Sequence, residues 1–353
     1  MTESALSVPG RRVLVVDAWA NAPRWRITPD AERAIRDAAP PEWDVRVMQA
    51  PTVSDGDGGT PPSGEALAAI ADAEVYVGFG ISRPLFEAAG RLRWVHSAAA
   101  GVGSALFPAM RESDVILTNS AGVHAVPIAE HVLAGVLFLV RALDQMVELQ
   151  RARHWDRERF AGAPSVVREM SDCRALIIGA GGLGGAIASR FTALGARCIG
   201  VRRNPARGPP AGFERVVGPD EWRALLADCD VLVLAAPATE ETRALVGAAE
   251  LDALPRGAIV VNVSRGTLLD EDGLAERVRR GALRGAVLDV FRVEPLPDAS
   301  PLWALPSVVI SPHVSGVSLN GFWRRELALF LENWRRYQRG ELMQNVVDKD
   351  AGY

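Results

Sequence analysis

The stretch "LIIGAGGLGGAIASRF", residues 176–191, decides the fold prediction. It places Gly179, Gly181 and Gly184 in the spacing G-x-G-x-x-G, directly after an apolar strand and directly before an alanine-rich helix. In such a turn the first glycine permits the tight bend, the second admits a pyrophosphate, and the third lets the helix pack closely on the sheet. Strand, turn and helix together predict a dinucleotide-binding site rather than an ordinary turn of an α/β sheet.

Apolar runs that end in turn residues continue on both sides of this turn. The second half of the chain contains six: "RALIIGAGG", "ARCIGVRR", "CDVLVLAAP", "GAIVVNVSRG", "GAVLDVF" and "SVVISPH". The first third contains five: "RVLVVDAW", "DVRVMQA", "AEVYVGFG", "LRWVHSAAAG" and "VILTNSAG". Helical stretches such as "SGEALAAIADA" lie between several of them. This alternation predicts an α/β protein with two doubly wound parallel-sheet domains.

Three further segments complete the expected organisation. The apolar pattern from about Pro127 to Arg153 predicts one long helix that bridges two domains or docks a second subunit. The segment from about Leu319, "LNGFWRRELALFLENWRRYQRG", predicts an amphipathic helix that returns to the first domain. The stretch "PTVSDGDGGTPPSG", residues 51–64, is rich in glycine, proline and aspartate and predicts an exposed loop.

Composition excludes several classes of function. The chain has 353 residues, is 48% hydrophobic and carries a formal net charge of -4, which gives no basic field for nucleic acid or anionic lipid. The N-terminal "MTESALSVPG" lacks the organisation of a signal peptide, so we expect a cytoplasmic protein. Three cysteines and five histidines show no metal-ligand spacing, so we expect no metal site.

The stretch "CIGVRRNP" ends the second strand of the dinucleotide unit with Arg202 and Arg203. In an NAD site this strand usually ends in a carboxylate that binds the ribose hydroxyls. Here no acidic residue occurs between Asp172 and Glu214, and a guanidinium suits a 2'-phosphate. The alternative is a surface turn in an arginine-rich chain, because Lys349 is the only lysine among 39 basic residues. We predict a preference for NADP(H) over NAD(H).

Polar residues follow three strands of the second half of the chain. Arg265 follows "AIVVNVS", Glu294 follows "AVLDVF" by two residues, and His313 follows "VVIS". If these strands share one parallel sheet, their carboxyl ends converge. A histidine that exchanges a proton, a carboxylate that holds it and a cation for a substrate carboxylate are the groups that reduction of a 2-oxo acid needs. Each residue separately also has a structural explanation, such as a loop cap or a half-buried histidine.

The sequence resembles the D-isomer-specific 2-hydroxyacid dehydrogenases over nearly its whole length. The resemblance rests on "GAGGLGGAIA", "NVSRGTLLDEDGL", "GAVLDVFRVEPLP" followed by "SPLW", and "SPHVSG". It implies that Arg265 binds substrate, that His313 is the acid/base and that Glu294 is its partner. It also implies that Asp289 holds the nicotinamide carboxamide, and that the backbone of Ala100 and Gly101, within "AAAGV", holds the substrate carboxylate. Gly182, Leu183 and Pro237 complete the expected cofactor contacts.

The same resemblance implies a domain organisation and an assembly. A discontinuous substrate domain is expected to comprise residues 1–120 and 319–353, and the dinucleotide-binding domain residues 121–318. A cleft that closes on substrate and a homodimer built around the long helix are also implied.

Within the family, the ending "VVDKDAGY" and the arginines after the second strand look most similar to the NADPH-dependent glyoxylate and hydroxypyruvate reductases. The predicted function is therefore the reduction of small 2-oxo acids to D-2-hydroxy acids. Two alternatives stay open: a corepressor-like protein that senses dinucleotides, and a formate-type dehydrogenase. The formate alternative is disfavoured because Ser311 and Pro312, not an amide side chain, precede His313. His96 and His131 are expected to be packing residues, although His96 lies near the substrate loop.

Overall fold

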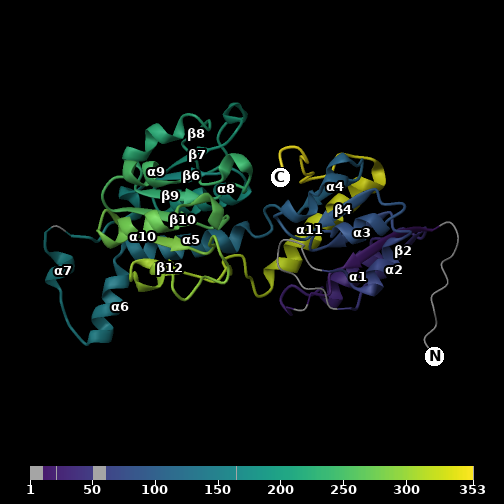
Figure 1. Ribbon diagram of the computed structural model, residues 1–353, viewed down its shortest axis with the longest axis horizontal. Coiled ribbons are helices and arrows are strands. Elements are labelled where there is room, and N and C mark those ends of the chain that lie inside the picture. The colour runs from purple at the N-terminus through teal and green to yellow at the C-terminus, as the bar shows by residue number, and fades with distance from the viewer. Residues whose placement is uncertain (1–10, 21, 51–60, 164, 353) are drawn as a thin grey trace. The chain divides into compact units, whose positions relative to one another are not determined.

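The computed structural model describes residues 11–20, 22–50, 61–163 and 165–352. The N-terminal decapeptide and most of the loop expected over residues 51–64 lie outside these ranges. The chain divides into two compact units (Figure 1). Unit 1 comprises residues 1–123 and 318–353, and unit 2 comprises residues 124–317.

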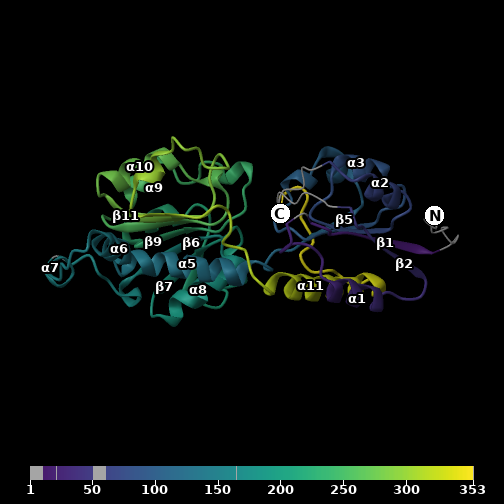
Figure 2. The same cartoon turned by 90° about the horizontal axis from the view of Figure 1, so that it is seen from below.

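Unit 1 is a parallel five-stranded sheet with helices on both faces. Its strands lie in the order β2-β1-β3-β4-β5, the flavodoxin-like arrangement. They are β1 (Arg12–Asp17), β2 (Trp43–Val47), β3 (Val75–Gly78), β4 (Trp94–Ser97) and β5 (Ile116–Asn119). Helices α2 (Gly64–Ile70) and α3 (Arg83–Ala88) cover one face, and α1 (Pro29–Asp37) and α11 (Gly321–Arg339) cover the other (Figure 2). The short helix α4 (Pro108–Glu112) precedes β5.

The C-terminal helix α11 is amphipathic and completes the core of unit 1. Phe322, Phe330 and Trp334 are buried on its inner face, and the Phe330 ring stacks on Trp94 of β4 with 5.6 Å between centroids. The chain after α11 then runs beside β5, where the Val347 amide donates to the Leu117 carbonyl over 2.8 Å. Residues more than two hundred positions apart in sequence therefore share one hydrophobic core.

Unit 2 is a parallel seven-stranded sheet in the order β12-β11-β10-β9-β6-β7-β8. Its strands are β6 (Arg174–Ile178), β7 (Arg197–Val201), β8 (Arg215–Val217), β9 (Val231–Leu234), β10 (Ala258–Asn262), β11 (Leu283–Leu288) and β12 (Val308–Ile310). Helices α9 (Ala248–Ala253) and α10 (Glu271–Arg279) cover one face, and α5 (Ala125–Val140) and α8 (Gly182–Ala193) the other (Figure 2). The strand order reverses between β6 and β9, where dinucleotide-binding sheets hold their ligand.

Both parallel α/β sheets predicted from the sequence are confirmed, but one strand of the second sheet was missed. The sequence predicted six strands in the second sheet, but β8, three residues long at the sheet edge, was missed. The equally short β12 is apolar throughout (Val-Val-Ile), whereas β8 begins with Arg215 and has only two consecutive apolar residues, too little pattern to be recognised.

The prediction of a single helix from Pro127 to Arg153 was wrong. The chain instead forms α5 and α6 (Leu143–Ala152), which are bent by 64° relative to each other. Ala142 takes a left-handed conformation with φ of 55° in the break between the two helices. No glycine or proline marks this break in the sequence. Asp144, buried at the start of α6, forms a two-pronged ion pair with Arg284 of β11 at 2.5 and 2.9 Å, and this pair holds the new helix direction.

The short helix α7 (Glu158–Ala161) follows, and α6 and α7 project from the body of unit 2 (Figure 1). Within the described ranges, no single helix has the length and apolar composition needed to cross a membrane. The bent pair α5 and α6 meets that criterion only when both helices are counted together.

Candidate active site

The glycine turn between β6 and α8 needs its glycines for three different reasons. Gly179 has φ of 109°, and a Cβ there would lie 2.5 Å from the backbone of Ala235 beyond β9. A Cβ on Gly184 would lie 2.0 Å from the Gly179 carbonyl oxygen, so the helix packs directly on the turn. Around Gly181, in contrast, a Cβ would meet no atom within 4 Å. The turn is therefore closed on the protein side and open on the side of Gly181.

The start of α8 fits the pyrophosphate of a dinucleotide. The amides of Gly182, Leu183 and Gly184 belong to the first helical turn and so lack acceptors within the helix. Such amides, with the positive end of the helix dipole, bind anions. Pro237 follows the neighbouring strand β9, and its carbonyl accepts from the Thr242 hydroxyl over 2.8 Å, which fixes this second turn. Both turns lie at the carboxyl ends of adjacent strands.

Arg202 and Arg203 follow β7 directly, at the same edge of the sheet. Arg202 is half-buried and its Nη2 donates to the Gly208 carbonyl oxygen over 2.5 Å, so part of this guanidinium fixes its own loop. Arg203 is exposed. Residues 173–213 contain no aspartate or glutamate, so this segment offers no carboxylate for a ribose diol. The strand end is positive, which suits a phosphate better than a ribose diol.

His313 and Glu294 meet at the carboxyl ends of β12 and β11. His313 Nδ1 lies 2.8 Å from Glu294 Oε2, and Oε1 of the same carboxylate accepts the Phe291 amide over 2.9 Å. Both side chains are partly exposed, 47% for His313 and 36% for Glu294. Within the described part of the chain, His313 Nε2 makes no hydrogen bond. The carboxylate therefore holds the ring through Nδ1 and leaves Nε2 to exchange a proton with a ligand.

Asp289 orders the turn that carries His313. Its carboxylate is buried and accepts the Ser311 hydroxyl over 2.6 Å, the Val314 amide over 2.9 Å, and both the amide and the hydroxyl of Ser315. Its carbonyl oxygen accepts the His313 amide over 2.9 Å. This turn is demanding, because His313 has φ of 53°. The carboxylate is thus engaged within its own chain, and its expected contact with the nicotinamide carboxamide stays a prediction.

Sequence reasoning missed the two serines that flank His313. Ser311 also lies 3.1 Å from His131 Nε2 of α5, so His131 belongs to this network through a specific polar contact. The signal was present in "SPHVS", because two hydroxyls on either side of a strand-end histidine are suited to fixing its turn.

Arg265 lies at the carboxyl end of β10, the strand next to β11. It is half-buried and its Nη1 donates to the Ser264 carbonyl oxygen over 2.8 Å. A Cβ on the following Gly266 would lie 1.9 Å from the backbone of Phe291, so this turn packs against the segment that leads to Glu294. Since β10, β11 and β12 are neighbours, all three predicted residues follow adjacent strands of one sheet.

The predicted substrate loop of unit 1 follows β4. Ala100 is exposed and Gly101 is half-buried. Asn119 Nδ2 donates to the Ala100 carbonyl oxygen over 3.0 Å, and the Ser120 amide donates to the Ala99 carbonyl oxygen over 3.1 Å. The amides of Ala100 and Gly101 donate no hydrogen bond to the described residues. Two free neighbouring amides on a loop held through its carbonyl oxygens are suited to binding a carboxylate.

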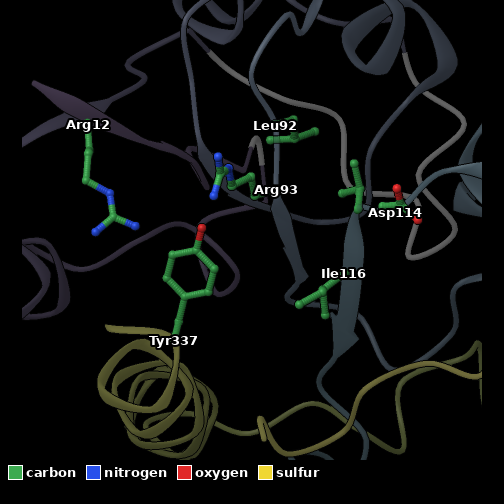
Figure 3. Close-up of a pocket in the computed structure, with 7 residues that line it drawn as sticks. Arg12, Leu92, Arg93, Asp114, Ile116 and Tyr337 are labelled. Carbon is green, nitrogen blue, oxygen red and sulfur yellow. The ribbon is translucent and has the colours of Figure 1, made fainter. Parts of the chain in front are cut away.

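A cavity of about 640 Å³ in unit 1 is not part of this chemistry. Arg12, Arg93, Asp114, Ile116 and Tyr337 line it (Figure 3). Apart from Tyr337 of α11, these residues lie at or next to the amino ends of β1, β4 and β5, whereas the loop of Ala100 and Gly101 follows the carboxyl end of β4. Ligands of parallel sheets bind at the carboxyl ends, so the cavity does not mark the candidate site.

The cysteines offer no reactive thiol. Cys173, Cys198 and Cys229 are buried and unpaired as disulfides, and burial raises the pKa of Cys198 and of Cys229 to about 12. Neutral buried thiols are poor nucleophiles and poor metal ligands. The described residues also contain no group of three or more His, Cys, Asp or Glu side chains placed to hold a metal ion.

The class of protein that this arrangement fits is an α/β dehydrogenase, because a glycine turn suited to a dinucleotide and a histidine–carboxylate contact lie at the carboxyl edge of one sheet. Comparisons with known proteins agree with this class. Residues 133–315 match the family model "D-isomer specific 2-hydroxyacid dehydrogenase, NAD binding domain". The chain therefore belongs to the D-isomer-specific 2-hydroxyacid dehydrogenase family and is an NAD(P)-dependent enzyme of that family.

Similar proteins carry different substrate names. A glyoxylate/hydroxypyruvate reductase B of Pectobacterium carotovorum is 32% identical over 79% of this chain and 87% of its own length. A D-3-phosphoglycerate dehydrogenase of Methanocaldococcus jannaschii is 31% identical over 80% of this chain, which spans about half (53%) of that protein. The structure of a D-isomer-specific 2-hydroxyacid dehydrogenase from Xanthobacter autotrophicus, in complex with NADPH and MES, has a TM-score of 0.77 at 29% identity, covering 97% of this chain and 100% of that one.

Proposed function

We propose that this protein reduces small 2-oxo acids to D-2-hydroxy acids with NADPH, with glyoxylate and hydroxypyruvate as the leading substrates. The observation that carries the proposal is the hydrogen bond from His313 to Glu294, 2.8 Å long, which leaves Nε2 of a partly exposed histidine available. The similarity to a glyoxylate/hydroxypyruvate reductase adds support for the substrate class.

Each residue has a defined part in the proposed reaction. NADPH, when bound, supplies the hydride that adds to the carbonyl carbon. His313 Nε2 donates the proton that the carbonyl oxygen takes up, so that C=O becomes CH–OH. Glu294 stabilises the positive charge of the protonated ring before this transfer. Arg265 neutralises the substrate carboxylate and polarises the carbonyl, and the amides of Ala100 and Gly101 bind the same carboxylate.

The proposed preference for NADPH rests on the end of β7. Arg202 and Arg203 are positive, and no acidic residue among residues 173–213 can bind a ribose diol or repel a phosphate. A relative of the same fold was crystallised with NADPH.

A panel of 2-oxo acids, assayed with NADPH and NADH in parallel, tests both parts of the proposal. We expect the highest kcat/KM with glyoxylate or hydroxypyruvate and with NADPH. A dinucleotide sensor would turn over none of the acids, and equal or better use of NADH would reject the cofactor assignment. Formate oxidation in the presence of NADP or NAD would instead favour the formate-type alternative.

We also propose a homodimer formed through the arm of α6 and the residues that follow. Leu143 and Met146 expose 42% and 37% of their surface on α6, and Trp155 beyond it exposes 92%. Large apolar side chains gathered on a projecting arm are suited to burial against a second copy. Light scattering should give the mass of a dimer for the wild type and of a monomer for a Leu143→Asp, Trp155→Asp double variant. A monomeric wild type would reject this assembly.

A further inference from the structure

Unit 1 contains a second histidine–carboxylate pair, and it is buried. His96 of β4 and Glu326 of α11 expose 0% and 2% of their side chains, and His96 Nε2 lies 2.9 Å from Glu326 Oε1. The surrounding side chains are aromatic, and the His96 ring lies 5.5 Å from that of Phe330 between centroids. Burying a charge in such surroundings is unfavourable unless the charge is paired and hydrogen-bonded.

The pair belongs to a chain of five hydrogen bonds. Trp94 Nε1 donates to Thr118 Oγ1 over 2.8 Å, and Thr118 Oγ1 lies 2.8 Å from His96 Nδ1. Beyond the pair, Glu326 Oε2 lies 2.6 Å from Ser120 Oγ, which lies 2.8 Å from the Ser97 carbonyl oxygen.

The two hydroxyls of this chain each have two possible acceptors. Ser120 Oγ can donate to Glu326 Oε2 or to the Ser97 carbonyl oxygen. Thr118 Oγ1 accepts from Trp94 Nε1, and it lies 2.8 Å from His96 Nδ1 and 3.4 Å from the Val95 carbonyl oxygen. Every polar side-chain atom of the His96–Glu326 pair therefore has a hydrogen-bond partner.

The chain ends on the predicted substrate loop. Ser97 is the last residue of β4, and its carbonyl oxygen is held by Ser120, whose own amide holds Ala99. The Ala99 amide in turn lies 3.3 Å from Ser97 Oγ. The free amides of Ala100 and Gly101 come next. A group on the C-terminal helix is thereby connected to a loop more than two hundred residues earlier.

We propose that Glu326 and His96 are positioning residues for this loop: the Glu326 carboxyl group, held by His96, fixes Ser120, and through it the amides of Ala100 and Gly101 that receive the substrate carboxylate. The assignment of those amides to the substrate rests on the proposed function. The linkage from Glu326 to the loop stands on the contacts of unit 1 alone.

Two variants and two controls test the linkage. Glu326→Leu removes both polar contacts of the carboxyl group, and Ser120→Ala removes the link while sparing the pair. Glu326→Gln keeps an acceptor oxygen for His96 Nε2 and offers an amide N–H to Ser120 Oγ, whose own proton can go to the Ser97 carbonyl oxygen, so it keeps both polar contacts. Glu332→Leu, on the same helix, is the matched control. In the described structure, the ion pairs of Glu332 are with Arg335 and Arg336 of that helix and do not reach the loop.

Hydrogen exchange of the loop amides gives a readout that does not need turnover. We expect Glu326→Leu and Ser120→Ala to raise exchange at residues 98–102 by about 10-fold, the effect of one lost buried hydrogen bond, while Glu326→Gln and Glu332→Leu match the wild type. The KM for glyoxylate should rise by about the same factor in the first two variants, with the dissociation constant of NADPH changed less than about twofold.

The outcomes separate the two proposals. Unchanged loop exchange in both Ser120→Ala and Glu326→Leu overturns the positioning role, even if their melting temperatures fall. If Glu326→Leu does not fold, Ser120→Ala decides. If the wild type reduces no 2-oxo acid but loop exchange responds as expected, the proposed function fails and the linkage stands.

Discussion

The two units contain the same pair of side chains at nearly the same distance, in opposite surroundings. His313 and Glu294 in unit 2 lie 2.8 Å apart and expose 47% and 36% of their side chains, whereas His96 and Glu326 in unit 1 lie 2.9 Å apart and expose 0% and 2%. Only the first pair leaves a ring nitrogen without a partner in the described structure. The difference teaches that a histidine–carboxylate contact becomes an acid/base site through access, not through its geometry alone.

Replacing the exposed histidine should give the largest effect on turnover. We expect His313→Ala to lower kcat by about 100-fold or more, the scale of a lost general acid, because no other side chain of the described structure takes its place on Glu294. Steady-state reduction of glyoxylate with NADPH measures this effect. His154→Ala, at an exposed histidine outside the site, is the matched control and should retain wild-type kcat. A kcat for His313→Ala within threefold of the wild type would reject the acid/base role.

A second contrast concerns two buried strand-end aspartates. Both oxygens of Asp289 in unit 2 accept hydrogen bonds, whereas Asp17 in unit 1 accepts one from Tyr76 over 2.9 Å and its Oδ1 has no partner in the described structure. Burial raises the pKa of Asp17 from 3.8 to about 6, against the opposing effect of the Tyr76 hydrogen bond. The folded state thus binds the proton of Asp17 more tightly than the unfolded chain does.

This raised pKa has a defined consequence for stability. Stability linked to Asp17 is fully present below pH 3.8 and is lost as the pH rises through about 6. The loss amounts to about 3 kcal/mol above that range. Asp17→Asn, which keeps an acceptor for Tyr76, should therefore raise the free energy of unfolding at pH 8 by about 2 to 3 kcal/mol and leave it unchanged at pH 3.5.

Urea denaturation at the two pH values measures the difference. Asp30→Asn, at an exposed aspartate of the same unit, should change neither value by more than about 0.5 kcal/mol. Equal effects of Asp17→Asn on the free energy of unfolding at both pH values would show that folding does not raise the pKa of Asp17.

Replacing the carboxylate of the exposed pair should have the smallest effect. Glu294→Gln keeps an acceptor oxygen for His313 Nδ1, and it removes the charge and the acceptor of the Phe291 amide. Ion pairs that are more than a third exposed are worth about 1 kcal/mol or less. We expect kcat for glyoxylate reduction to fall by about fivefold or less. A fall in kcat as large as that of His313→Ala would mean that water is excluded from the His313–Glu294 pair during turnover. The surroundings of this pair would then resemble those of the buried His96–Glu326 pair more than the ligand-free structure indicates.

The sequence contained most of the scaffold of both units, because strand ends and glycine turns leave local signals. All eleven predicted strands and the spacing of Gly179, Gly181 and Gly184 fall where the structure has them. The break at Ala142 was not predictable, since only the packing of Asp144 against Arg284 sets the direction of α6. The role of His96 was equally hidden, because Glu326 lies 230 residues away in sequence. Long-range polar contacts leave no periodic trace in a single sequence.

The stereochemistry of the product tests the central claim most directly. Hydroxypyruvate has a prochiral carbonyl, so its reduction with NADPH by the purified protein can be followed by chiral separation of the glycerate formed. The account predicts the D-isomer, formed with consumption of one NADPH per molecule. Formation of the L-isomer, or no NADPH oxidation with any 2-oxo acid, would contradict it.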